Sequence, residues 1–266
     1  MLRIVARGTL AVTVLLALGY LAICGLMVLR QDSLVYYPQY TRVAAADTNF
    51  ALEREGVVLR GWQFNPGQVD TLLYFGGNAE SAQHSARELA AWFPGRSIYV
   101  LAYRGYGASE GEPSQPAITG DALALHDHVR SLHPGGDLAV VGRSLGSGVA
   151  AQLAGARDVD RLTLVTPFDS LAGVAALHYP WLPVRLLMRD DYDSARALAD
   201  FQQPVLIIEA GRDQVVPGIS TQRLVDALPR APERLRIADA DHDLALGTPA
   251  RVQALKAFVD GSGDAD

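Results

Sequence analysis

The sequence predicts an α/β protein with a mostly parallel central sheet, helices on both faces of the sheet, and one membrane-spanning helix in front of it. Three observations predict this class. The chain has 266 residues, of which 49% are apolar, enough for one large domain with an appendage. Short apolar runs alternate with segments of helical period along most of it. An uncharged apolar stretch covers residues 8–29.

The composition argues against a polyanionic partner. The formal net charge is −6, and no cluster of Lys and Arg stands out that would follow a phosphate backbone, so we expect no nucleic-acid binding. Lys256 is the only lysine among many arginines, which together with abundant Ala and Gly indicates a GC-rich bacterial genome. Cys24 is the only cysteine, so no disulfide can form within the chain.

Residues 1–30 are predicted to be a membrane anchor. A helix over residues 8–29 would be about 33 Å long, enough to cross the roughly 30 Å hydrocarbon layer of a bilayer. A cleaved signal peptide would have a shorter apolar region and a small-residue cleavage site, which Arg30 and Asp32 do not provide. Ile23 stands where a lipoprotein would need a small residue before its cysteine, so Cys24 is interpreted as an apolar filler.

The charges at the two ends of this stretch predict its orientation. Arg3, Arg7 and the free amine outweigh Arg30, which has Asp32 beside it. The positive-inside tendency then puts the N-terminus in the cytoplasm. The rest of the chain would face the outer, periplasmic side of a bacterial inner membrane.

The remaining chain is predicted to form a linker over residues 31–47 and one domain over residues 48–262. The linker shows neither helical nor strand period, and its tyrosines suit either the membrane interface or the domain surface. The domain begins with two paired strands, 50–55 and 57–62, that form an antiparallel edge about Gly56.

Alternating strands and helices follow this edge. Apolar runs predict buried strands at 71–75, 97–102, 138–141, 162–165 and 205–208, and helical periods cover 81–92, 117–132 and 145–154. Residues 170–201 break this alternation with Tyr179-Pro180-Trp181-Leu182-Pro183, which predicts a small cap. The run 235–238 and a terminal helix from Pro249 complete the domain.

Ser144 is the candidate nucleophile. It lies in Gly142-Arg143-Ser144-Leu145-Gly146, between the run 138–141 and an Ala- and Leu-rich helical segment. Such a strand-turn-helix elbow exposes the serine hydroxyl, and the glycines remove Cβ atoms that would collide. The Leu145 N–H would begin the helix, where it could hold an oxyanion. The alternative is an ordinary strand-helix connection.

A serine nucleophile needs a base and an orienting acid. His242 follows the run 235–238, and Asp213 follows the strand at 205–208, so both lie in loops at the carboxyl end of the sheet with Ser144. The order Ser144, Asp213, His242 matches one hydrolase fold and not the two common alternatives. Asp169, after the strand at 162–165, is the rival acid. The other histidines lie on helices or in the cap: His84, His126, His128, His133 and His178.

The chain resembles the α/β-hydrolase superfamily, and within it the membrane-anchored Bem46/ABHD13-like branch related to the serine aminopeptidase S33 group. The resemblance covers nearly the whole length. It is carried by the anchor with the following 31–38 segment, the loop 103–111, the elbow 142–148, Gly211-Arg212-Asp213 and His242. It implies an α/β-hydrolase fold and serine hydrolase chemistry without a cofactor or metal, with Ser144 as nucleophile, His242 as general base and then acid, and Asp213 as its orienting partner.

The second oxyanion donor is expected from the loop after the third strand, Phe75-Gly76-Gly77-Asn78-Ala79-Glu80, through the backbone N–H of Asn78. In the family this loop usually begins His-Gly-Asn, whereas Gly76 stands at the histidine position here. Arg104, in the glycine-rich loop that follows the strand at 97–102, is interpreted as structural support paired with a carboxylate. The alternative is contact with an acidic substrate.

The predicted reaction is transfer of an acyl group from an ester, thioester or amide to water through an acyl-enzyme. The partner would be a small acyl substrate or a short peptide; oligomeric state is open. One rival is an aminopeptidase that holds a peptide amine on Asp190, Asp191 and Asp193 of the cap, and another is a non-catalytic binding module with the same fold.

Overall fold

A computed structural model describes residues 2–243 and 247–261 and confirms the predicted fold class. Within these residues an eight-stranded sheet runs in the order β1-β2-β4-β3-β5-β6-β7-β8. The strands are β1 Phe50–Arg54, β2 Val57–Phe64, β3 Asp70–Phe75, β4 Arg96–Leu101, β5 Leu138–Arg143, β6 Arg161–Val165, β7 Val205–Ala210 and β8 Glu233–Ile237. Residues 244–246 and the predicted domain end at 262 lie outside the described residues.

Only the edge of the sheet is antiparallel. Strand β2 runs antiparallel to both β1 and β4, and all other neighbouring strands are parallel. The strands β3 to β7 are nearly continuous apolar runs whose residues are almost all buried, as expected when helices cover both faces. In β1 half-buried and exposed residues alternate, which suits an edge strand with one solvated face.

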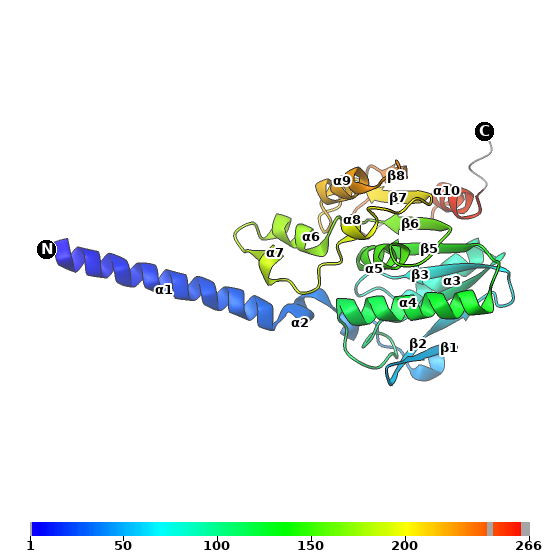
Figure 1. The fold of residues 1–266 in the computed structure, drawn as a ribbon, viewed down its shortest axis with the longest axis horizontal. Coiled ribbons are helices and arrows are strands. Elements are labelled where there is room, and N and C mark those ends of the chain that lie inside the picture. The colour runs from blue at the N-terminus through cyan, green and yellow to red at the C-terminus, as the bar shows by residue number, and fades with distance from the viewer. Residues whose placement is uncertain (1, 244–246, 262–266) are drawn as a thin grey trace.

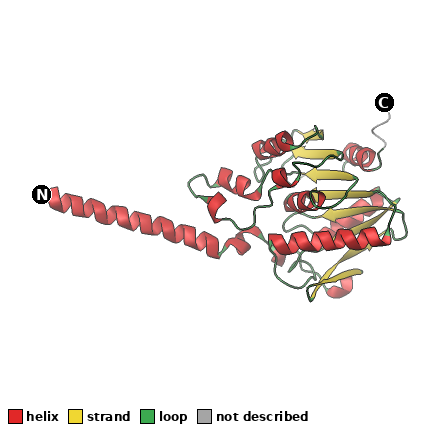
Figure 2. Cartoon of the chain, viewed as in Figure 1, coloured by secondary structure: helices red, strands yellow, loops and turns green. Residues whose placement is uncertain are grey.

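Helices cover both faces of this sheet (Figure 1). On one face α5 packs on β5 and against α4 and α8, and on the other α3 packs on β4 and meets α10. These helices, with α9 beside α8, are α3 Ala82–Trp92, α4 Gln115–Leu132, α5 Leu145–Ala154, α8 Ser194–Ala197, α9 Gly218–Ala227 and α10 Pro249–Val259. The carboxyl ends of the parallel strands face the side on which the remaining helices lie (Figure 2).

The helix predicted as an anchor and the segment predicted as a cap lie together on that side. Helix α1, Leu2–Leu29, extends away from the domain as a single rod, and α6, Leu171–His178, and α7, Val184–Leu187, lie beside its C-terminal part (Figure 1). Ser170 begins α6 by accepting a hydrogen bond from the Gly173 N–H. The cap therefore covers the end of the sheet where loops of α/β folds carry functional residues.

The segment predicted as a linker, residues 31–47, is folded onto the domain. It forms the short helix α2, Gln31–Val35, and two 3-10 turns, and Tyr36 is only 2% exposed within the main core. Its sequence shows no period because a few separate residues are buried by tertiary contacts, not one face of a regular element. The Tyr36 hydroxyl donates to Asp190 Oδ2 at 2.6 Å and lies 3.1 Å from that of Tyr192.

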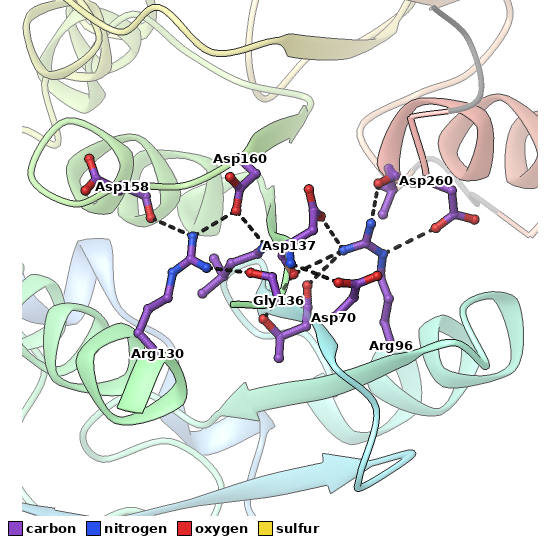
Figure 3. A network of polar contacts seen from close by, with 11 residues as sticks. Asp70, Arg96, Arg130, Gly136, Asp137, Asp158, Asp160 and Asp260 are labelled. Carbon is purple, nitrogen blue, oxygen red and sulfur yellow. Dashed lines mark hydrogen bonds and ion pairs between the residues drawn. The ribbon is translucent and has the colours of Figure 1, made fainter. Parts of the chain in front are cut away.

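The opposite end of the sheet is held by arginine-aspartate contacts (Figure 3). Arg96, at the start of β4, donates to Asp137 Oδ1 at 2.6 Å and to the Val259 carbonyl at 2.7 Å. Arg130 of α4 donates to Asp160 Oδ2 at 2.8 Å. These contacts join the starts of the central strands to α4 and α10 at the end of the sheet away from Ser144.

Candidate active site

Ser144 lies on a sharp turn between β5 and α5. Its φ of 50° and ψ of −118° put a non-glycine residue in a sparsely populated region, at a cost of about 1–3 kcal/mol. The Ser144 N–H donates to the Val165 carbonyl at 2.9 Å, which ties the turn to β6. The surrounding structure therefore holds this half-buried serine in a strained conformation at the end of the sheet.

The two glycines of this turn are required by close approach of backbone atoms. A Cβ on Gly146 would lie 2.0 Å from the Phe75 carbonyl oxygen, and a Cβ on Gly142 would lie 2.3 Å from the Gly146 carbonyl oxygen. Neither of these carbonyl groups can move away to make room for a Cβ unless β3 or α5 moves with it. These contacts are the physical reason for the Gly-x-Ser-x-Gly spacing.

Three side chains predicted from the sequence meet at this turn. Ser144 Oγ lies 2.8 Å from His242 Nε2, and His242 Nδ1 lies 2.8 Å from Asp213 Oδ2. Because an ionised carboxylate only accepts, Nδ1 is the protonated ring nitrogen and Nε2 faces the serine as an acceptor. This is the arrangement in which the imidazole can take a proton from the hydroxyl.

The loops after the last two strands, β7 and β8, hold the aspartate and the histidine in contact with each other. The Asp213 side chain is only 4% exposed, and its Oδ1 accepts the N–H groups of Val215 at 2.9 Å and Val216 at 2.8 Å. The Arg212 N–H donates to the Ala240 carbonyl at 2.8 Å, which joins the loop after β7 to the loop after β8. The carboxylate is thus fixed by three contacts, one of which orients His242.

The rival acid, Asp169, is engaged elsewhere. Its Oδ1 accepts the Ser220 hydroxyl of α9 at 2.5 Å, and its carbonyl accepts the Ala195 N–H at 3.0 Å. Among the described residues the carboxylate that contacts His242 is Asp213. Asp169 instead joins the end of β6 to α8 and α9.

The two candidate oxyanion donors border the same cavity as Ser144. Leu145 is the first residue of α5, so its N–H has no carbonyl partner within the helix. In the loop after β3, the Gly77 N–H already donates to Glu80 Oε2 at 2.6 Å. The next backbone N–H of this loop that could bind an oxyanion is therefore that of Asn78. That the Leu145 and Asn78 N–H groups bind an oxyanion remains a prediction.

The Asn78 side chain has a role that sequence reasoning missed. Its amide donates to the Val35 carbonyl at 2.5 Å, and its Oδ1 accepts the Tyr106 hydroxyl at 2.6 Å and the Tyr37 N–H at 3.1 Å. The loop beside Ser144 is thereby tied to the chain that immediately follows the anchor helix. No local pattern signals this, because the partners lie about forty and thirty positions away in the chain.

Glu80 is a second residue that the sequence did not reveal. Besides the Gly77 N–H, it accepts the Tyr74 hydroxyl at 2.6 Å and that of Ser85, and Arg143 Nη1 lies 3.7 Å from its Oε2. Burial raises the pKa of Tyr74 well above its ordinary value, so this phenol keeps its proton and donates. Glu80 therefore fixes the loop after β3 and also faces the arginine next to Ser144.

An apolar cavity of about 310 Å³ opens at Ser144. Its walls come from the cap, from the end of α1 and from α2, and Gln31 and Asn78 are among its few polar residues. Its apolar lining includes Met27, Leu34, Val35, Leu145, Phe168, Leu171, Val174, Leu182, Val184, Leu187, Met188, Val215 and Val216. A long apolar chain would lose water on entering this space and end beside the serine hydroxyl.

The charged residues named as possible substrate contacts serve the fold. Arg104 donates to both oxygens of the buried Asp121, at 2.7 and 2.8 Å, which confirms its interpretation as structural support. In the cap, Asp190 accepts from Tyr36, Asp191 accepts the Ala172 N–H, and Asp193 begins α8. Among residues 2–243 and 247–261 no group of three or more His, Cys, Asp and Glu is arranged to hold a metal ion.

The parallel sheet with its antiparallel edge, and a strained serine between strand and helix, are features of a hydrolase fold. The chain belongs to the alpha/beta hydrolase family, whose profile, described as an alpha/beta hydrolase domain, matches residues 107–254. It is 38% identical over 212 residues to an uncharacterized protein of Mycobacterium tuberculosis, covering 74% of this chain and 75% of that protein.

A second relative and a solved structure extend the comparison. The chain is 30% identical over 226 residues to the alpha/beta hydrolase domain-containing protein WAV2 of Arabidopsis thaliana, covering 72% of this chain and 73% of that protein. Its structure resembles that of the Pyrococcus furiosus esterase Pf2001 with a TM-score of 0.64, covering 85% of this chain and 98% of the esterase. At 16% identity the second likeness shows a shared fold alone.

Proposed function

We propose that this protein is a membrane-anchored serine hydrolase that cleaves acyl esters or thioesters through an acyl-enzyme. The observation that carries the proposal is the continuous contact from Ser144 Oγ through His242 to Asp213, with 2.8 Å at each step. The hydrolase family and the esterase with the same fold support the general reaction class.

The proposed reaction has two halves. His242 Nε2 takes the proton of the Ser144 hydroxyl as the oxygen attacks the acyl carbon, and Asp213 stabilises the imidazolium that forms. The N–H groups of Leu145 and Asn78 bind the oxyanion of the tetrahedral intermediate. His242 then gives the proton to the leaving group, and water attacks the acyl-serine by the same route in reverse. No cofactor enters these steps.

Anchoring through α1 is supported by length, exposure and packing. Helix α1 holds a stretch, Ala6–Leu29, that is long and apolar enough to cross a bilayer, and most of its described side chains are exposed. A cleaved signal peptide is absent from the mature protein, so its residues do not contribute to the packing of the domain. Cys24 of this helix, in contrast, is buried against cap residues Leu182 and Val184. We therefore propose that α1 is retained as the anchor of the mature protein.

The nucleophile is tested by labelling with a fluorophosphonate probe. Wild type and the control Ser131→Ala, on the exposed side of α4, should both be labelled and should hydrolyse p-nitrophenyl esters. Ser144→Ala should lose labelling, and its kcat should fall about 10³-fold or more because the hydroxyl is the reacting group. Labelling that persists in Ser144→Ala would move the nucleophile elsewhere. A folded wild type that is never labelled would favour the binding-module alternative.

A substrate panel tests the acyl class. The apolar walls of the cavity and the structural use of Asp190, Asp191 and Asp193 favour acyl esters over peptides with a free amine. The kcat/KM for p-nitrophenyl esters should rise with chain length as more CH₂ groups become buried. Aminoacyl anilides that are cleaved faster than any ester would instead support the aminopeptidase reading.

A further inference from the structure

The last turns of the anchor helix and the cap form one packed unit. Cys24, Leu182 and Val184 are each less than 10% exposed and form an apolar cluster of their own, against which Met27 and Leu187 pack. The Tyr20 hydroxyl donates to the Trp181 carbonyl at 3.0 Å. Gln31 then fixes the other end, donating to the Leu187 carbonyl at 2.9 Å and accepting the Arg189 N–H at 2.6 Å.

This packing sets the depth of the cap relative to the bilayer. Tyr20 precedes Leu29 by nine positions, so its contact with Trp181 lies about 14 Å back along the helix. One leaflet contributes about half of a hydrocarbon layer roughly 30 Å thick. If α1 spans the bilayer, the loop at residues 179–188, which we call the cap loop, lies at the level of the acyl chains of one leaflet.

The cap loop has the side chains that such a position requires. Trp181 is 56% exposed and Leu186 is 86% exposed, and they share the loop with exposed Tyr179. Arg185 is the single charged residue among positions 179–188, and its long aliphatic stem allows the guanidinium to reach the headgroups. An apolar surface next to a transmembrane helix is stabilised by lipid and not by water.

Part of the cap-loop backbone is already paired or carries no donor. An unpaired N–H is costly in hydrocarbon, which offers it no hydrogen-bond partner. Pro180 and Pro183 carry no N–H, and the N–H groups of Tyr179, Leu182, Leu186 and Met188 donate to carbonyls of the cap. Tyr20 and Gln31 satisfy two of the loop's carbonyls.

The cavity joins this surface to the serine. Met27 and Gln31 of the anchor side and Leu182, Leu187 and Met188 of the cap side line the same space as Ser144. The cavity therefore extends from the serine to residues of both α1 and the cap loop.

We propose that the cap loop inserts into the leaflet next to the hydrolase domain, and that the substrate is an acyl ester lipid of that leaflet whose acyl chain enters the cavity from the side on which α1 and the cap loop lie. This inference rests on the proposed function for its chemistry. The ester bond of the lipid is the bond that breaks, its alcohol leaves with the proton from His242, and water releases the fatty acid from Ser144.

Insertion is tested without activity, on the full-length protein in phosphatidylcholine vesicles. Lipids brominated on the acyl chains should quench part of the tryptophan fluorescence of wild type, and this part should be lost in Trp181→Phe. Trp62, which is 4% exposed inside the core, and Trp92, at the end of α3, remain as internal references. The same fractional quenching in both proteins would overturn insertion of the cap loop.

Lipid entry is tested with a charge on the exposed cap residue and a matched control. Leu186→Asp should lower hydrolysis of a diacyl lipid in vesicles about tenfold or more, because a carboxylate is costly in hydrocarbon. It should leave hydrolysis of a short soluble ester within about twofold, since Leu186 is 86% exposed and its loss opens no core cavity. Leu132→Asp, 55% exposed at the end of α4, should change neither rate.

The outcomes separate the two proposals. Equal loss on both substrates in Leu186→Asp, or no loss on the lipid, would overturn lateral entry. A wild type that cleaves soluble esters but no vesicle lipid would overturn the substrate class and leave the serine hydrolase standing. Absence of fluorophosphonate labelling in wild type would overturn the hydrolase proposal itself, while the quenching result would still decide insertion.

Discussion

At the scale of single residues, the loop beside Ser144 depends on one carboxylate whose side chain is 11% exposed. Glu80 accepts from the Gly77 N–H and the Tyr74 hydroxyl, both at 2.6 Å, and faces Arg143. It does not line the apolar cavity, so it is a positioning residue and not a catalytic one. Its contacts determine where the next backbone donor, Asn78, lies.

Glu80→Gln should therefore reduce kcat with little change in KM. The amide keeps the size of the side chain but accepts at only one oxygen, so one donor loses its partner at a cost of about 1–3 kcal/mol, or roughly 5- to 150-fold in rate if the loop shifts. Steady-state kinetics on a p-nitrophenyl ester measure both constants. Glu88→Gln, on the exposed side of α3, is the control, and an equal fall in both variants would contradict the positioning role.

The sequence could predict the residues of the candidate site that follow strands. Ser144, Asp213 and His242 each come just after an apolar run, and parallel strands bring their carboxyl ends to one edge. Glu80 and the side chain of Asn78 could not be predicted in this way. Their roles depend on which distant backbone groups face them, and no periodicity records that.

At the scale of elements, the segment that follows the anchor is part of the domain. Tyr36 reaches Asp190 of the cap at 2.6 Å and approaches Tyr192 at 3.1 Å. Burial raises the pKa of Tyr36 above its ordinary value, and the nearby Tyr192 and Asp190 raise it further. The contact therefore links α2, the cap and the core only while the phenol is protonated.

This gives a stability prediction with a defined sign. The pKa of Tyr36 in the folded state lies above its unfolded value of 10.0. The contribution of the Tyr36 phenol to the free energy of unfolding is therefore fully present below pH 10 and is lost as the pH rises above it. Tyr36→Phe should be less stable than wild type by about 1–3 kcal/mol at pH 8, because Asp190 loses its donor. Urea unfolding in detergent should show this gap shrinking at pH 10.5.

The exposed Tyr40, with 72% of its surface accessible, provides the matched control. Tyr40→Phe should unfold like wild type at pH 8. A gap between wild type and Tyr36→Phe that stays constant or widens between pH 8 and 10.5 would contradict the buried-phenol explanation.

Secondary structure was predictable where a whole face of an element is buried. The apolar runs located β3 to β7 to within one or two residues, because these strands are covered on both sides. The short helices α2, α7 and α8 were not predicted as separate elements. Each has four or five residues, fewer than two helical turns, so no period can appear.

At the scale of the whole molecule, the two ends of the sheet have different roles. Arginine and aspartate contacts close the end where the strands begin, and the cap, the anchor and the serine lie at the other end (Figures 1 and 3). The proposed active site therefore lies at the end of the sheet on the side of α1, and the arginine and aspartate contacts lie at the far end.

The proposed orientation predicts the outcome of a reporter fusion in bacterial cells. Alkaline phosphatase fused to the C-terminus should be active, because Arg3 and Arg7 favour a cytoplasmic N-terminus and an external domain. Replacing both with glutamate in the same fusion should lower its activity. A C-terminal reporter that works only in the cytoplasm would reverse the orientation and place the domain on the inner face.

The bonds from Asn78 to Val35 and Tyr37 bear on how the catalytic portion can be isolated. A truncated chain that starts after position 37 would exchange these partners for water and release the loop after β3 from its support. Preparations of the domain without α1 should therefore start at Gln31 or earlier. Conditions that loosen the contact between residues 31–37 and this loop should weaken the proposed activity even when Ser144, Asp213 and His242 are untouched.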